Sequence, residues 1–233
     1  MEYQSVFKRY ELKYLLTRQQ AASLKRVMED YMASDDYGLT NIRNLYYDTD
    51  NYRLIRNSIE KPVYKEKLRL RSYGDPKNGE VFVELKKKYQ SVVYKRRLAM
   101  PETQALAWLE SGQCPQDHQI GREINAFLAF YGTLAPRVFL SYDREAFFCK
   151  DGSDLRITFD DNIRCRQENL HLHENSGVPV LDPALVLMEI KTGGGIPLWL
   201  THALSVGRIY KTSFSKYGTA YQRFIFEGAR NHV

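Results

Sequence analysis

The chain has 233 residues, 43% of them hydrophobic, which is enough for one sizeable domain and rather short for two. Its 34 Lys and Arg residues against 28 Asp and Glu give a net charge of +6, which suits phosphate-rich or acidic ligands without selecting one. Three scattered cysteines argue against a disulfide framework or a zinc site and favour a reducing compartment. We therefore expect a single domain over residues 1–233.

Hydrophobic periodicity predicts the elements in chain order. Strands are expected over residues 6–16, 41–47, 65–73, 80–88, 91–100, 136–149, 154–164 and 184–192. Helices are expected over 17–32, 52–58, 101–112, 120–131, 197–206 and the end of 213–226. Thr17 is expected to cap the first helix, and Asp48 or Asp50 the second.

The stretch 65–73, KEKLRLRSY, concentrates positive charge on one strand face. Alternation places Lys65, Lys67, Arg69 and Arg71 on the same side, with successive same-face residues about 6.6 Å apart. Cations so arranged repel one another unless an extended anion lies along them, although a solvated strand face would carry the same pattern. The other strands must decide between these interpretations.

Charged residues share a face on most of the other expected strands. The groups are Arg9, Glu11 and Lys13; Glu84, Lys86 and Lys88; Lys95 and Arg97; Arg156 and Asp160; and Glu189 and Lys191. The strand 184–192 is otherwise apolar, and a buried charge is costly unless it is paired or used. These repeated charged faces favour a tunnel wall around a polyanion, with Lys67 near its mouth and Lys65 outside it.

Two further motifs point to no site of their own. His171 and His173 form an HxH pair without a third ligand nearby, so we interpret them as loop histidines. The GGG run at 193–195 lacks the GKS or GKT of a Walker motif, and we interpret it as a flexible connection.

The charged motifs follow one another in the order of a known family. They are RxExK at 9–13, KLRLR at 67–71, ELK at 84–86, YKRR at 94–97, SYDREAF at 141–147, LRIT at 155–158, MEIK at 188–191 and SFSKY at 213–217. From about Phe7 to Phe226 the chain resembles the VTC domain, the catalytic domain of the eukaryotic vacuolar transporter chaperone polyphosphate polymerase. That domain is a branch of the triphosphate tunnel metalloenzymes, related to the CYTH proteins. Arg9 stands where the ExExK signature of CYTH proteins begins, which favours the VTC branch.

The resemblance implies an α+β fold in which an antiparallel β-barrel of about eight strands forms a tunnel, with peripheral helices. The implied catalytic residues, which would hold the phosphates, are Lys13, Arg69, Arg71, Lys86, Lys95, Arg144 and Arg156. Further contacts to ATP and polyphosphate or triphosphate would come from Arg97, Tyr142, Lys191, Ser215 and Lys216. The cofactor would be Mn²⁺ or Mg²⁺, held by Glu189 with help from Glu11.

The activity that this resemblance implies is that of a metal-dependent phosphotransferase, a polyphosphate polymerase that transfers the γ-phosphate of ATP to a growing chain. Ser213 departs from the pattern, because the yeast-type enzyme has a basic residue there. Two alternatives stay open: an inorganic or nucleoside triphosphatase, and a non-catalytic module that binds polyphosphate or inositol phosphates. Nucleic acid is not an expected partner, because the cations lie beside acids rather than among exposed aromatics.

A cytoplasmic location is expected. The first residues, MEYQSVFKRY, are charged and alternating where a secretory signal needs an apolar segment. No run approaches the roughly eighteen apolar residues of a membrane-spanning helix. Fungal polymerases of this kind sit in membrane complexes, so any membrane partner of this chain would be a separate polypeptide.

Overall fold

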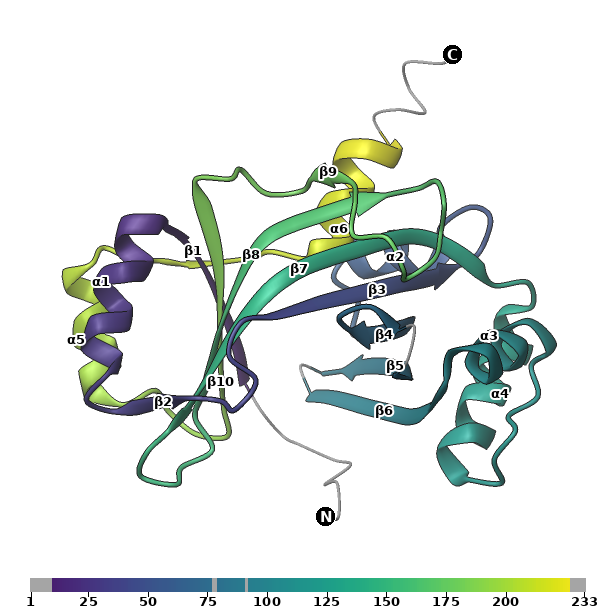
Figure 1. The fold of residues 1–233 in the computed structure, drawn as a ribbon, viewed down its shortest axis with the longest axis horizontal. Helices are drawn as coiled ribbons and strands as arrows, with labels where there is room; N and C mark the ends of the chain where they lie inside the picture. Colours follow the sequence, from purple (N-terminus) through teal and green to yellow (C-terminus); the bar gives the residue numbers. More distant parts are fainter. Residues whose placement is uncertain (1–9, 77–78, 91, 227–233) are drawn as a thin grey trace.

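One curved sheet forms the framework of the protein, with helices packed around it (Figure 1). The computed structural model describes residues 10–76, 79–90 and 92–226. The strands are β1 (Tyr10–Thr17), β2 (Met32–Ser34), β3 (Thr40–Asp48), β4 (Tyr64–Tyr73), β5 (Glu80–Tyr89), β6 (Val92–Pro101), β7 (Ala135–Cys149), β8 (Arg156–Arg166), β9 (Val178–Pro179), β10 (Leu185–Thr192) and β11 (Lys211–Thr212). The helices are α1 (Arg18–Met28), α2 (Arg53–Ile59), α3 (Glu102–Ser111), α4 (Gln119–Tyr131), α5 (Leu198–Val206) and α6 (Lys216–Ala220), followed by a π-helical turn over Tyr221–Phe226.

Hydrogen bonds join the strands in the order β11-β1-β10-β8-β7-β3-β4-β5-β6, and β2 and β9 pair with β7 and β8. Every pairing in this sheet is antiparallel. The 15-residue strand β7 lies at the centre of this order, and its register shifts against β3 and against β8. Irregularities of this kind bend a strand and increase its twist, which favours a curved sheet.

The expected closed β-barrel is not confirmed. Among the described residues, the hydrogen-bonded path ends at β6 on one side and at β11, beside β1, on the other. The two ends still approach each other, because Lys86 of β5 lies 3.5 Å from Glu11 of β1. Side chains make this contact, because no backbone pairing joins these two strands among the described residues. Over the described residues the architecture is therefore α+β, an open, strongly curved antiparallel sheet with six α-helices.

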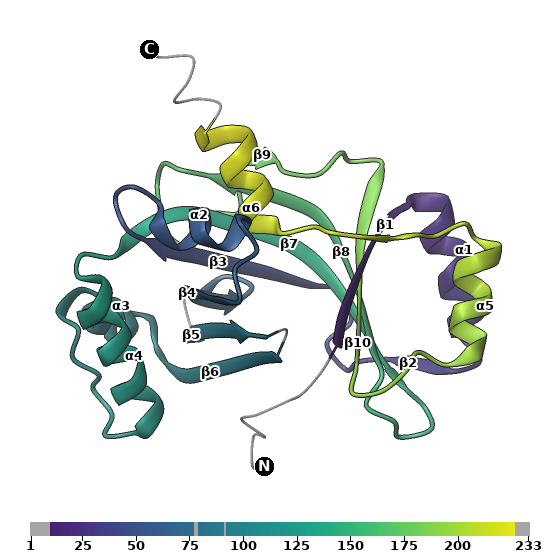
Figure 2. The same cartoon turned by 180° about the vertical axis from the view of Figure 1, so that it is seen from behind.

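Two of the three apolar clusters lie on the outer face of the sheet. On β4, Leu68 and Leu70 are fully buried in an apolar cluster, whereas the intervening Arg69 and the flanking Lys67 and Arg71 line the inner face. One cluster packs α3 and α4 against β4, β5 and β6; a second packs α1 and α5 against β1, β8 and β10; a third packs α2 and α6 against β3 and β7. Figure 2 shows these helix pairs from behind. The first two clusters bury apolar side chains outside the sheet. The third lies on the inner face, where Ile42 and Tyr142 share strand faces with polar residues such as Arg144.

Thr17 caps α1 as the sequence predicts. Its side chain accepts a hydrogen bond from the Gln20 backbone N, and the Gln20 side chain accepts one from the Thr17 backbone N. The expectation that this helix runs to about Met32 is wrong, because α1 ends at Met28. Residues 32–34 instead pair with β7 as β2, which satisfies their backbone groups in a ladder.

The capping interpretation of Asp48 is also confirmed. Its carboxylate accepts hydrogen bonds from the backbone N of Leu54 at 2.8 Å and of Ile55 at 3.0 Å, at the start of α2.

The two-residue strands β9 and β11 were not expected from the sequence. The predicted strand residues 6–9, including Arg9, and Ser91 lie outside the described residues.

His171 and His173 lie in the irregular segment between β8 and β9, as expected. The His173 ring contacts Asp75 Oδ1 at 3.1 Å and Glu102 Oε2 at 2.9 Å, so it fastens this segment to the β4–β5 turn and to α3.

Within the described ranges, none of the helices has the length and apolar character needed to cross a membrane.

Candidate active site

A cavity of about 820 Å³ lies against the inner face of the sheet. Side chains from β1, β3, β4, β5, β6, β7, β8 and β10 line it, together with the segment that leads into α6. Among the described residues its cations are Lys13, Lys67, Arg69, Arg71, Lys86, Lys95, Arg97, Arg144, Arg156, Lys191 and Lys216, and its carboxylates are Glu11, Asp35 and Glu189. This strong excess of positive charge in a concave site suits a multiply charged anion.

Strand register places opposite charges side by side on the cavity wall. Between β1 and β10, Lys13 lies opposite Glu189 and Glu11 lies opposite Lys191. Because cross-strand neighbours on one face are about 5 Å apart, each pair is within reach of an ion pair. The alternation seen in the sequence thus becomes a two-dimensional array of charges.

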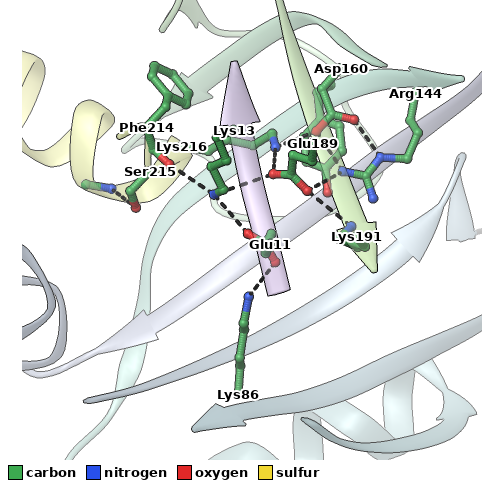
Figure 3. Close-up of polar contacts among 12 residues, drawn as sticks. Glu11, Lys13, Lys86, Arg144, Asp160, Glu189, Lys191, Phe214, Ser215 and Lys216 are labelled. Atoms are coloured by element: carbon green, nitrogen blue, oxygen red, sulfur yellow. Dashed lines mark hydrogen bonds and ion pairs between the residues drawn. The ribbon is translucent and has the colours of Figure 1, made fainter. Parts of the chain in front are cut away.

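Glu189 on β10 is the centre of one ion cluster (Figure 3). Its carboxylate lies 3.2 Å from Lys216, 3.2 Å from Lys191, 3.5 Å from Lys13 and 3.6 Å from Arg144. Burial acts to raise the pKa of Glu189, but these four cations outweigh it and hold the pKa well below the ordinary value. Glu189 is therefore a fully ionised carboxylate surrounded by cations.

Asp160 on β8 supports this cluster from beneath. It is fully buried, and Arg144 binds it through two parallel hydrogen bonds of 2.5 and 2.6 Å. Lys216 lies 2.5 Å from the same carboxylate. A bidentate pair fixes the plane of a guanidinium, so Asp160 orients Arg144 while leaving part of its edge toward the cavity.

Glu84 on β5 has the same function at the opposite side of the cavity. Its carboxylate is buried and lies 2.6 Å from Arg69, 3.6 Å from Arg71 and 2.6 Å from Lys95. Burial acts to raise the pKa of Glu84, but Arg71, Arg69 and Lys95 hold it well below its usual range. One buried carboxylate thus positions three of the cations that line the cavity.

Tyrosines fill the space between the two ion clusters. Tyr142 is buried, its hydroxyl accepts a hydrogen bond of 3.4 Å from Arg71, and the Lys216 ammonium lies 4.6 Å from its ring centre. Tyr46 accepts a 3.1 Å hydrogen bond from Arg69 and stacks on Tyr217. These rings keep the cations apart and limit their rotamers, which preorganises the wall.

The carboxylates Glu11 and Glu189 are the candidates for holding a divalent metal ion. Burial raises the pKa of Glu11, but Lys86 and Lys13 lower it to about 2, against an upward contribution from Glu189, so both carboxylates are ionised oxygen donors. The described part of the chain contains no group of three or more metal-ligating side chains. Mg²⁺ is commonly bound by one or two carboxylates together with substrate phosphates, and this donor set fits that arrangement rather than an all-protein cage.

The structure brings the sequence-predicted site residues into one place. All fourteen line the cavity: Glu11, Lys13, Arg69, Arg71, Lys86, Lys95, Arg97, Tyr142, Arg144, Arg156, Glu189, Lys191, Ser215 and Lys216. Their roles in binding or catalysis remain predictions. Lys65 is not among the lining residues, as expected, and its ammonium donates to the Ser58 backbone carbonyl.

Sequence reasoning assigned no role to several residues that shape the site. Asp160 and Glu84 share strand faces with the predicted cations, but only the structure shows that they orient them. Asp35, which precedes β3, lies 3.3 Å from Arg156 and was missed because no strand pattern marks a loop residue. A usable signal was present for Glu84, since an acid at the centre of a basic strand face implies pairing.

This chain belongs to the VTC-domain family. The family's sequence model matches residues 8–225, which is nearly the whole chain and agrees with the resemblance drawn from the charged motifs. No curated protein matches the sequence.

Solved structures with a similar fold include two proteins named as putative cyclases. The putative adenylate cyclase of Bacillus halodurans has a TM-score of 0.55 and 15% identity, over 94% of this chain and 100% of that one. The putative adenylyl cyclase of Hippeastrum has a TM-score of 0.56 and 14% identity, over 93% of this chain and 95% of that one. At such low identities the similarity shows a common fold alone.

Proposed function

We propose that this protein is a polyphosphate polymerase, which transfers the γ-phosphate of ATP to the end of a polyphosphate chain. The observation that carries the proposal is the cavity itself, where cations from seven strands and α6 outnumber carboxylates among the described residues. A linear polyanion satisfies such a set of cations along its whole length, whereas a small monoanion would leave most of them unpaired. Membership in the VTC-domain family supports the same conclusion.

In this proposal the two ion clusters bind different parts of the substrate. Arg69, Arg71 and Lys95, positioned by Glu84, hold one set of phosphates. Arg144 and Lys216, positioned by Asp160, hold the phosphates on the other side. The cations are fixed before substrate arrives, so little reorganisation is needed to stabilise the charge that develops on the transferred group.

The chemical step needs no base from the protein. A terminal oxygen of the polyphosphate chain, already ionised, attacks the γ-phosphorus of ATP, and the bond from that phosphorus to the bridging oxygen breaks. ADP leaves with the bonding electrons and the chain grows by one phosphate. Aligned cations and excluded water are what such phosphoryl transfer requires of a protein.

A divalent ion would be held by Glu189 and Glu11 together with substrate phosphates. When bound, it would neutralise charge on the phosphate oxygens during transfer. The expected metals are Mn²⁺ and Mg²⁺, which favour hard oxygen donors of this kind.

The test is synthesis of polyphosphate from ATP. Purified protein incubated with ATP and Mn²⁺ should form chains that migrate as a ladder on a gel and release ADP in equal amount. Arg144→Gln should abolish the ladder, whereas Arg164→Gln, on β8 but absent from the cavity lining, should leave it intact. Release of free phosphate without chains would reject the polymerase.

A triphosphatase is the second candidate, because the Hippeastrum protein of similar fold is described as having a dominant triphosphatase activity. The same cations would hold inorganic triphosphate or a nucleoside triphosphate, and water would be the attacking group. Release of orthophosphate from tripolyphosphate, without ADP-linked chain growth, would favour this function over the polymerase.

A further inference from the structure

Lys67 on β4 differs from the cations around it. It lines the cavity and is half-buried, but within the part of the chain that the structure describes it forms no ion pair with a carboxylate. Its neighbours do form such pairs: Arg69 with Glu84, and Lys13 and Lys86 with Glu11. An uncompensated charge in a protein interior is costly, so a ligand with the opposite charge is the expected partner.

The contact that Lys67 does make is to a hydroxyl. Its ammonium donates to Ser215 Oγ at 3.2 Å, and the same oxygen accepts from the Gly218 backbone N at 3.1 Å. A serine hydroxyl has two acceptor positions and one proton, so with both acceptor positions used its O–H remains to donate elsewhere. Two of the three N–H groups of Lys67 are likewise left over. The pair therefore presents donors only, which suits the oxygens of a phosphate.

The segment that contains Ser215 is held in place from two sides of the sheet. Lys13 on β1 donates to the backbone carbonyl of Phe214 at 3.0 Å, while Lys67 on β4 contacts the next residue (Figure 3 shows the Lys13 contact). Residues that are 201 and 148 positions apart in the sequence are joined in this way. The pair of donors is thus fixed at the α6 side of the cavity.

We propose that Lys67, to which the resemblance assigns no contact with substrate, joins Ser215 in a phosphate subsite of this cavity, in addition to the two ion clusters. The inference rests on the proposed function, since it assumes that a polyphosphate or triphosphate occupies the cavity. Lys67 binds one phosphate group through charge, and the Ser215 hydroxyl donates to the same group.

Electrostatics link this subsite to pH. Burial makes the largest contribution and lowers the pKa of Lys67. Nearby cations lower it further, to about 7; they are Lys86, Lys13, Lys65 and Arg69, on β1, β4 and β5. The ammonium is therefore partly deprotonated in the empty site above pH 7. A bound phosphate favours the charged form, so Lys67 takes up a proton when ligand binds at pH 8.

The experiment uses Lys67→Met and the matched control Lys65→Met, two residues earlier on the same strand face and outside the cavity lining. Binding of tripolyphosphate is measured by calorimetry at pH 8 in two buffers that differ in ionisation enthalpy, and thermal unfolding is measured without ligand. Loss of one charge-assisted contact should raise the Kd of Lys67→Met about tenfold or more. Its proton uptake should fall below that of the wild type, and its Tm should be equal or higher because an apolar side chain replaces a half-buried amino group that has no carboxylate partner among the described residues. Lys65→Met should change the Kd less than threefold.

The possible results separate the proposed subsite from the proposed function. If the wild type binds and Lys67→Met binds equally well, the subsite is rejected while the proposed function stands. If the wild type does not bind tripolyphosphate, both are rejected. A Lys67→Met protein that fails to fold or melts well below the wild type would assign Lys67 a structural role and overturn the proposal. Lys67→Arg, which keeps a cation, should recover most of the affinity.

Discussion

Lys86 on β5 lies 3.5 Å from Glu11 on β1, although these strands are near opposite ends of the hydrogen-bonded strand order. The ion pair brings together the two sides of an open sheet, and both residues face the cavity. Side chains, rather than a backbone ladder, therefore complete the enclosure in the described part of the chain. An anionic ligand would compete with Glu11 for Lys86.

Lys86→Gln should separate ligand binding from stability. The Lys86 side chain is 41% exposed in the ion pair, and pairs so open to solvent contribute at most about 1 kcal/mol to the free energy of unfolding. Tripolyphosphate affinity should nevertheless fall about tenfold, because a charged contact to phosphate is lost. The control is Lys88→Gln, on the same strand face but outside the cavity lining. A loss of stability well above 1 kcal/mol, measured by urea unfolding, would contradict this view of the pair.

Glu84→Gln should be strongly destabilising. Removal of its charge leaves Arg69, Arg71 and Lys95 without their buried counter-charge, at a cost of roughly 3 kcal/mol or more in the free energy of unfolding. Glu123→Gln is a matched control. The Arg96 Nε donates to Glu123 at 2.8 Å, as the Arg69 Nε donates to Glu84, but the Arg96 pair is more exposed. The control should lose less than about 1 kcal/mol. Equal losses in urea unfolding would show that burial is not the deciding factor.

The effect of Glu84→Gln should depend on pH with a defined sign. The folded protein holds the pKa of Glu84 well below its ordinary value of 4.5, so the carboxylate contributes stability above that pH. This contribution is lost as the pH falls through the folded-state pKa. The stability difference between wild type and Glu84→Gln should be constant above about pH 5.5 and shrink below about pH 4. A difference that grows on acidification would contradict the assigned direction.

Glu189→Gln should remove turnover and keep substrate binding. Four cations now paired with Glu189 would be freed for phosphates, so the Kd for tripolyphosphate without metal should stay equal or decrease. Loss of the carboxylate that we propose holds the metal ion should lower kcat by about a hundredfold or more. Glu145→Gln, whose partner is Lys25 away from the cavity, is the control. Unchanged kcat in Glu189→Gln would remove this residue from the metal site.

Asp48→Ala should weaken the packing of α2 and α6, and through Tyr217 it should also loosen the cavity wall that this residue lines. Asp48 accepts hydrogen bonds from two backbone N–H groups of α2 and one of 3.0 Å from the Tyr217 hydroxyl. Loss of all three should cost about 2–4 kcal/mol in the free energy of unfolding, and Tyr217→Phe about 1 kcal/mol. Asp48→Asn, which keeps an acceptor oxygen, should be milder than Asp48→Ala. An equal loss for both variants would place the effect in the charge instead of the hydrogen bonds.

The sequence alone determined which charged side chains share a strand face. Side chains of a strand alternate with a period of two, so charged residues at every second position of 65–73, 80–88 and 184–192 had to share a face. That local rule predicted the long strands, while the fourteen predicted site residues followed from the family resemblance, Ser215 and Lys216 from the resemblance alone. Capping chemistry, equally local, predicted the start of α1 at Thr17.

Tertiary structure alone decided how those faces meet. Local alternation carries no information on which strands pair, so it could not show that the sheet stays open between β6 and β11 or that Lys86 reaches Glu11. The same holds for Asp160 beneath Arg144, and for Lys67 beside Ser215, 148 residues away. Ion pairs depend on distances of a few ångströms between distant segments, and only the folded chain sets those distances.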